Sequence, residues 1–255
     1  MAGDAAPVNP WHVVLLFAVG TIAGVLNVLA GGGSLLTLPV LLFLGLPAPL
    51  ANGTNRVAIL VQNIVAVGGF RSRGVLPLRL ALICTAPALL GGALGAQLAV
   101  TMDDLLFRRI LAGVMLGVCV IMIADPARRL RFDAARLGAL RTAVLMASFF
   151  GIGVYGGFIQ AGVGFLVITG LLVHGLDLVR INAVKVFVIG AFTVTALAVF
   201  IRNGQVDWSL GLALAAGNAL GGWIGANLAV SKGHDWIRRL VLVTVVVFAA
   251  RLFWR

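Results

Sequence analysis

The stretch VLNVLAGGGSLLTLPVLLFLGLPAP, residues 25–49, sets the fold of this chain. An apolar helix predicted over residues 11–30 runs into a glycine-rich break, and the apolar piece that follows is too short to cross a bilayer comfortably. Broken helices at membrane depth persist only inside protein or beside a cavity, because lipid cannot hydrogen-bond the freed backbone. The stretch therefore predicts a membrane protein with an interrupted helix in its interior.

The composition of the whole chain agrees with this interpretation. Of 255 residues, 61% are hydrophobic and 11% are charged, whereas soluble domains carry about 25% charged residues. One membrane domain accounts for nearly the whole length and leaves no room for a separate soluble catalytic domain. The net charge of +11 comes from basic residues in short gaps between apolar runs. That pattern is typical of cytoplasmic loops and argues against nucleic-acid binding.

Further apolar runs follow along the chain, and most are long enough to span a membrane. A second interrupted helix is formed by AGVG at 161–164 and the short run FLVITGLLVHGL. The predicted fold class is all-α, a polytopic transmembrane helical bundle with two inverted repeats and broken, short helix hairpins. The other predicted spans are residues 50–70, 76–100, 105–124, 142–160, 181–201, 208–230 and 236–253.

The two halves of the sequence repeat one another. GGALGAQLAV at 91–100 matches GGWIGANLAV at 221–230 with seven identities in ten positions, at an offset of 130 residues that also places Asn52 on Asn182. A unit of this length exceeds solenoid periods and is typical of duplicated transporters. The predicted organisation is transmembrane repeat 1 at 1–124, a cytoplasmic loop at 125–141 and transmembrane repeat 2 at 142–255.

Charge in equivalent loops distinguishes parallel from inverted repeats. Residues 71–79 carry three arginines, while residues 201–209 carry one arginine and one aspartate. Residues 101–109 are balanced, while residues 231–239 carry a net charge of +2. Because cytoplasmic loops gather basic residues, this swapped bias predicts an inverted repeat. We expect five segments per copy, with both termini outside.

Glycine and polar residues within these apolar runs are the candidates for a binding site. Polar groups in lipid are costly and face the protein interior, and glycine at a break frees backbone groups for a ligand. The N-terminus of a short helix attracts anions as well. The candidate substrate-binding residues are Asn27, Gly31, Gly32, Gly33, Ser34, Asn52, Thr54, Asn55, Gln160, Gly162, Gly164, Asn182 and Lys185.

These residues also have plainer interpretations. The break glycines could only permit tight hairpins or close helix contacts, which is the role expected for the GxxxG pairs that begin at Gly20, Gly91 and Gly221. Lys185 could face an exchangeable anion or could snorkel to the cytoplasmic interface, and the two interpretations stay equally open. For Arg56, snorkelling is slightly favoured.

Two long stretches resemble the signatures of the sulfite exporter TauE/SafE family of membrane permeases: GTIAGVLNVLAGGGSLLTLPVLLFLGLPAPLANGTNRVAILVQN at 20–63 and GFIQAGVGFLVITGLLVHGLDLVRINAVKVFVIG at 157–190. The resemblance covers almost the whole chain. It implies transport of small sulfur-containing or carboxylated anions such as sulfite or sulfoacetate. A basic residue often follows the first Asn-x-Thr of the family, and this chain has Asn55-Arg56, which leaves the position of that charge open. The resemblance extends a site role to Asn27, Gly31, Gly32, Gly33, Ser34, Asn52, Thr54, Asn55, Gly162, Gly164, Asn182 and Lys185.

The leading functional hypothesis is a secondary transporter that exports sulfite or organosulfonates by alternating access. An anion channel is the first alternative. A membrane-embedded enzyme is the weaker one, because the apolar helices contain no HExxH, acidic pair or Ser/His/Asp set, and we expect no enzyme activity. Neither the two cysteines nor the three histidines have metal-site spacing, so no cofactor or metal is expected. The substrate identity, the direction of transport and the oligomeric state are not fixed. The expected partners are a small anion and the lipid bilayer of a bacterial cytoplasmic (inner) membrane, and no nucleic acid. Whether a proton or a sodium ion is coupled to transport is not fixed by the sequence.

Overall fold

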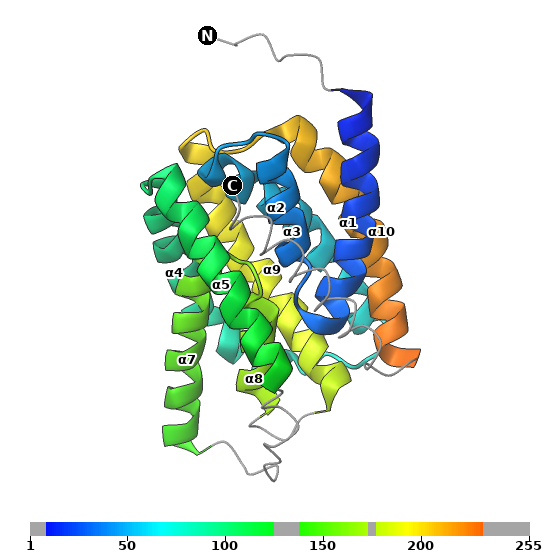
Figure 1. The fold of residues 1–255 in the computed structure, drawn as a ribbon. Coiled ribbons are helices and arrows are strands. Elements are labelled where there is room, and N and C mark those ends of the chain that lie inside the picture. The colour runs from blue at the N-terminus through cyan, green and yellow to red at the C-terminus, as the bar shows by residue number, and fades with distance from the viewer. Residues whose placement is uncertain (1–8, 125–137, 173–176, 232–255) are drawn as a thin grey trace.

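All regular structure in the described part of the chain is helical, which confirms the predicted class of a polytopic helical bundle. The computed structural model describes residues 9–124, 138–172 and 177–231. The predicted span 236–253 and nearly all of the loop 125–141 lie outside these ranges. The helices are α1 (Pro10–Ala30), α2 (Ser34–Phe43), α3 (Ala48–Arg71), α4 (Leu78–Val100), α5 (Asp104–Ala124), α7 (Ala139–Phe158), α8 (Val163–Leu172), α9 (Leu178–Arg202) and α10 (Trp208–Ser231) (Figure 1).

Helix length and composition fit a membrane environment. Four helices, α1, α4, α7 and α9, are long and apolar enough to cross a bilayer. The short apolar helices α2 and α8 have 10 residues each and follow α1 and α7 directly. The sequence predicted broken helices at these two places, and the structure places them there.

Each break is made by a residue in the left-handed backbone region. Helix α1 begins where the Asn9 side chain accepts a hydrogen bond from the N–H of Trp11 at 3.0 Å. It ends at Gly31, whose φ of 82° is left-handed and whose N–H bonds back to the carbonyl of Asn27 at 2.9 Å. The second break has two left-handed residues, Gln160 with a φ of 60° and Gly162 with a φ of 71°, between the end of α7 at Phe158 and the start of α8. Glycine adopts this conformation without a steric penalty, so Gly31 and Gly162 let the chain turn at the two breaks.

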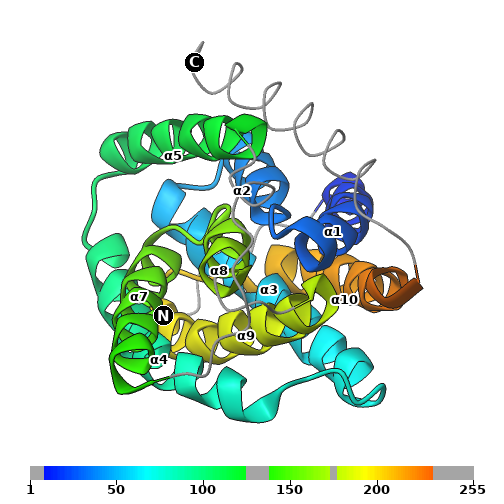
Figure 2. The same cartoon turned by 90° about the horizontal axis from the view of Figure 1, so that it is seen from below.

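Helices pair between the two halves of the chain more than within them. Helix α1 packs along α10 and α7 packs along α4, while α3 and α9 pack on one another (Figure 2). A Cβ on Gly24 would lie 2.9 Å from the Cα of Gly221, and a Cβ on Gly91 would lie 2.8 Å from the N atom of Val154. The GxxxG glycines therefore serve close helix packing, as expected.

Equivalent helices run in opposite directions. In Figure 1, α1 starts at the upper end of the molecule and α7 at the lower end, and the α3–α4 connection lies at the lower end whereas the α9–α10 connection lies at the upper end. Gly74 and Gly204, which close these two connections, share a φ of 66°. This is the arrangement that an inverted repeat requires, and the inverted membrane topology itself stays a prediction.

Candidate functional site

The two glycine breaks touch each other at the centre of the bundle. A Cβ on Gly31 would lie 2.6 Å from the Cα of Gly164, closer than real Cβ contacts come. Gly33 is equally confined, because its Cβ would lie 2.6 Å from the Cβ of Asn27. The C-terminal end of α1 and the start of α8 are thus brought together, and only glycine fits where these two backbone segments cross.

Arg56 of α3 holds the C-terminal end of α7. Its side chain is completely buried, at 0% exposure. Nη1 donates to the carbonyl of Gly156 at 3.1 Å and to Oε1 of Gln160 at 2.9 Å. Nη2 donates to the carbonyl of Gly157 at 2.5 Å and to Oδ1 of Asn52 at 3.4 Å. The last turn of a helix carries partial negative charge, so the guanidinium neutralises the end of α7.

An aromatic ring completes the surroundings of this guanidinium. The Cζ atom of Arg56 lies 4.8 Å from the centroid of the Phe200 ring on α9, which is a cation–π arrangement. The snorkelling interpretation of Arg56 is therefore wrong. Its charge lies inside the protein because the α7 break exposes carbonyl acceptors that a lipid interface would not supply.

Lys185 of α9 does the same for the C-terminal end of α1. It is 1% exposed, and Nζ donates to the carbonyl of Val28 at 2.8 Å and to Oδ1 of Asn182 at 2.7 Å. Val28 lies in the last turn of α1. Snorkelling to the interface is excluded for Lys185 too. Each half of the chain thus sends one buried cation to the end of the other half's first helix.

Buried amides and hydroxyls connect the helices around the two cations. Asn52 Nδ2 donates to the carbonyl of Phe158 at 2.7 Å, and Thr37 Oγ1 donates to Oδ1 of Asn55 at 2.6 Å. Gln160 Nε2 donates to Oγ1 of Thr193 at 3.0 Å. Gln160 also has a φ of 60°, a strained value for a residue with a side chain.

All the residues singled out from the sequence are buried, but the structure gives them different surroundings. Asn52 and Gln160 gather around Arg56, and Asn182 meets Lys185. Asn27 bonds to neither cation and instead donates to Oε1 of Gln62 at 3.2 Å. The hydroxyl of Thr54 accepts the N–H of Asp207 at 2.9 Å and so fixes the α9–α10 connection. The breaks bring together Gly31 and Gly164.

Several residues at this centre were not among the predicted site residues. Thr37 and Thr193 contact predicted residues, Arg56 was weighed with snorkelling slightly favoured, and Phe200 contacts Arg56. A signal was available for Arg56, because it lies one helical turn after Asn52 and shares its helix face. Thr193 lies on the same helix as Asn182 and Lys185 but was not singled out.

Most buried polar atoms without a partner in the described part of the chain are hydrogen-bond donors. Only Oδ1 of Asn218 is an acceptor. An unsatisfied buried donor costs about 1–3 kcal/mol, so a ligand rich in acceptor oxygens would stabilise this centre. The unpaired donors are Asn55 Nδ2, Arg56 Nε, Gln62 Nε2, Asn63 Nδ2 and Asn182 Nδ2.

The acidic side chains are elsewhere. All eight acidic residues of the sequence are aspartates. The four in the described ranges lie in connections or at helix starts, where Asp104 pairs with Arg108 at 2.7 Å and Asp177 pairs with Arg180 at 3.3 Å. In the described part of the chain, therefore, no carboxylate balances Arg56 or Lys185.

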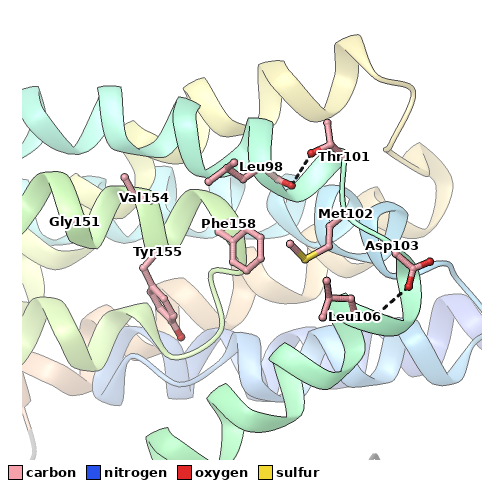
Figure 3. Close-up of a pocket in the computed structure, with 9 residues that line it drawn as sticks. All are labelled: Leu98, Thr101, Met102, Asp103, Leu106, Gly151, Val154, Tyr155 and Phe158. Atoms are coloured by element: carbon pink, nitrogen blue, oxygen red, sulfur yellow. Dashed lines mark hydrogen bonds between the residues drawn. The ribbon is translucent and has the colours of Figure 1, made fainter.

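A cavity of about 730 Å³ borders this centre. It lies between α4, α5 and α7, with Asp103 at the α4–α5 connection and Tyr155 and Phe158 on α7 (Figure 3). The carbonyl of Phe158 accepts the bond from Asn52, and the hydroxyl of Tyr155 donates to the carbonyl of Ala161 at 2.5 Å. One wall of the cavity is thus also a wall of the candidate site. A smaller cavity of about 170 Å³ includes Arg71 and Phe187.

Long apolar helices around two touching helix breaks, with buried cations and unpaired donors, define an integral membrane protein built like a transporter. The sequence model of the family described as "Sulfite exporter TauE/SafE" matches residues 16–252. The chain therefore belongs to the TauE/SafE family, and it is a membrane transporter of that family.

Curated relatives are similar to this chain over nearly their whole lengths. A "Probable membrane transporter protein" of Haemophilus influenzae is 28% identical over 243 residues, which cover 95% of this chain and 94% of the relative. "Probable membrane transporter protein YfcA" of Escherichia coli K12 is 27% identical over 248 residues, 97% of this chain and 91% of the relative. "Probable membrane transporter protein ORF9" of a Sinorhizobium species is 27% identical over 241 residues, which cover 94% of this chain and 92% of the relative. No solved structure matches.

Proposed function

We propose that this protein is a secondary transporter that exports small sulfur-containing or organic anions, such as sulfite or organosulfonates, across the bacterial cytoplasmic membrane by alternating access. The observation that carries the proposal is Lys185, a buried ammonium that no described carboxylate balances. Burying an unpaired ammonium costs several kcal/mol even after relaxation. An anionic substrate supplies the missing charge.

The hydrogen-bond donors near the breaks support an oxyanion as that substrate. An ammonium has three N–H donors, and Lys185 uses two of them on Val28 and Asn182. Asn55 Nδ2 and Asn182 Nδ2 are buried and unpaired. A sulfite or sulfonate group offers three acceptor oxygens to such donors. The N-termini of the short helices α2 and α8 add partial positive charge beside the breaks.

The pairing of the two halves supports alternating access. Each half holds the end of the other half's first helix through one cation, and the two breaks cross at Gly31 and Gly164. Rocking one repeat against the other would open the shared centre to each side in turn. A channel would need no such exchange of contacts, and its flux would not saturate with anion concentration.

A thermal-shift panel on the purified protein tests the proposed function. Sulfite, thiosulfate, taurine, sulfoacetate, methanesulfonate and short carboxylates are compared with chloride at equal ionic strength. A ligand present at one hundred times its Kd stabilises the folded protein by about 2.7 kcal/mol, so a specific anion should raise the melting temperature. A panel in which no sulfur-containing or organic anion exceeds chloride would contradict the proposal.

Lys185→Gln then tests where the anion binds. Loss of a charge-assisted hydrogen bond weakens binding by about 1.5–3 kcal/mol, or about ten- to a hundredfold in affinity. Arg180→Gln is the matched control, because Arg180 lies on the same helix and is exposed at its start. Native affinity in Lys185→Gln vesicles would remove Lys185 from the site.

A further inference from the structure

The two buried cations differ in whether they can lose their charge. A guanidinium stays protonated in proteins, and Arg56 accordingly has four acceptors within hydrogen-bond distance. An amine can lose its proton when it is buried. Lys185 has two acceptors, the carbonyl of Val28 and Oδ1 of Asn182.

We propose that the coupling ion of this transporter is a proton and that Nζ of Lys185 carries it together with the anion. The inference rests on the proposed function, because it presupposes that an anion binds at Lys185 and is released from it during transport. The number of donors at Nζ supports it. An ammonium has three N–H donors, one more than the acceptors around it, whereas a neutral amine has two N–H donors for two acceptors. The surroundings thus suit the charged form with an anion and the neutral form without one.

The transport step balances in atoms and charge. In the loaded site the ammonium and a monoanion form a neutral pair. On release the anion leaves, one N–H bond of Nζ breaks, and the proton passes to water on the same side while the electron pair stays on nitrogen. The amine keeps its two hydrogen bonds, and the site returns without net charge from Lys185. Protonation and anion binding on the other side complete the cycle.

No other titratable group in the described part of the chain contacts Nζ of Lys185. Helix α9 packs against α1, α3, α4, α7, α8 and α10. Helices α8 and α10 carry no ionisable side chain in their described residues. The titratable or charged residues on the others are His12 on α1, Arg56 and Arg71 on α3, Arg79 and Cys84 on α4, and Arg141 and Tyr155 on α7. None of them is a carboxylate that could balance the ammonium, and none is a hydrogen-bond partner of Nζ to which its proton could pass directly.

The test uses the full-length protein in proteoliposomes with methanesulfonate as the probe. This anion is fully ionised, so it brings no proton of its own. Anion uptake is followed with radiolabel, and internal pH with an enclosed dye. Net uptake should acidify the lumen by an equal number of protons and should not respond to a potassium diffusion potential set with valinomycin. Exchange of labelled for unlabelled methanesulfonate, which needs no net proton movement, is measured in parallel.

Variants assign the proton to Lys185. Lys185→Arg keeps the charge but cannot release it, so net proton-coupled uptake should fall at least about tenfold, with exchange still detectable. Lys185→Gln should move methanesulfonate without protons and should respond to the potential. Arg180→Gln, an exposed cation on the same helix, should keep the wild-type ratio of protons to anions. Melting temperatures of all variants in detergent verify that they are folded.

The outcomes separate the coupling from the transport. Wild-type vesicles that exchange methanesulfonate but take it up without protons would overturn the coupling and leave the proposed function standing. Uptake that depends on sodium instead of protons would likewise overturn the proton coupling and leave the proposed function standing. Either Lys185 variant with wild-type proton uptake would remove the proton from this residue. Wild-type vesicles that show neither exchange nor uptake would overturn the proposed function and the coupling together.

Discussion

The two halves of the molecule each place a buried cation against the last turn of the other half's first helix, but the two cations work in different surroundings. Arg56 meets two backbone carbonyls and two side-chain oxygens at the end of α7. Lys185 meets one carbonyl and one side-chain oxygen at the end of α1. The two contacts are thus alike in position and different in chemistry. The surroundings of Arg56 suit a permanent structural contact, whereas those of Lys185 suit a charge that is balanced when an anionic ligand binds.

The comparison fails altogether if the halves are not inverted, so the topology test has the largest expected effect. Ser72 and Asn203 are exposed at the two equivalent connections. Single cysteines at these positions, in a background without Cys84 and Cys119, should be labelled by an impermeant maleimide from opposite sides of the membrane. Labelling of both from one side would refute the inverted repeat.

Arg56→Gln should produce the largest loss of stability. The shorter amide cannot reach both carbonyls of α7, and each buried carbonyl left unpaired costs about 1–3 kcal/mol, or about 2–6 kcal/mol together. Unfolding in mixed detergent micelles measures the loss. Arg71→Gln is the control, because Arg71 is exposed in the last turn of the same helix. Equal stability of the two variants would show that Arg56 does not fasten α7.

Gly31→Ala should destabilise the protein by a somewhat smaller amount. The new methyl group would press on the backbone of Gly164, and overpacking of this kind costs about 1–3 kcal/mol in addition to about 1–2 kcal/mol for the left-handed φ. Gly45→Ala separates the two contributions, since Gly45 has a φ of 93° but nothing within 4 Å of a Cβ. If both variants lose the same stability, the crossing of the breaks has no energetic importance of its own.

Lys185→Gln should have the smallest effect on stability. It removes a cation with two hydrogen-bond partners, but it also removes a buried charge whose desolvation opposes folding, so we expect a net loss of only about 1 kcal/mol. Both variants are measured in the same unfolding assay. The ratio of their losses in unfolding free energy compares the structural importance of the two buried cations. A larger loss for Lys185→Gln would reverse their assignment.

The helices of the fold were predictable from local sequence, because apolar runs, glycines and prolines act where they stand. The span predicted at 142–160 forms as α7, Ala139–Phe158, and the two breaks lie where glycine was found. The burial of Arg56 was not predictable in the same way. Its acceptors at Gly156 and Gly157 are about one hundred residues away in sequence. Those carbonyls are free to accept only because α7 ends there. The hydropathy pattern describes side chains and does not predict which backbone carbonyls lack a partner within the helix.

Lys185 shows the same limit from the other side. The sequence marked it as a charge within an apolar run, but it left burial and snorkelling equally open. The deciding partner is the backbone carbonyl of Val28 in the opposite half of the chain. Valine has an apolar side chain, so the sequence pattern did not mark it as a hydrogen-bond partner. Side-chain patterns indicate where polar atoms are needed, whereas backbone acceptors of a broken helix appear only in three dimensions.

The hydroxyl of Tyr155 bonds to the carbonyl of Ala161, directly beside the second glycine break. The chain contains one tyrosine. Growth on 3-fluorotyrosine would therefore place a fluorine label at that position and nowhere else, without mutation or chemical modification. Fluorine NMR in nanodiscs would then give a resonance for each arrangement of the break, and the exchange between resonances during titration with an anion would time its movement.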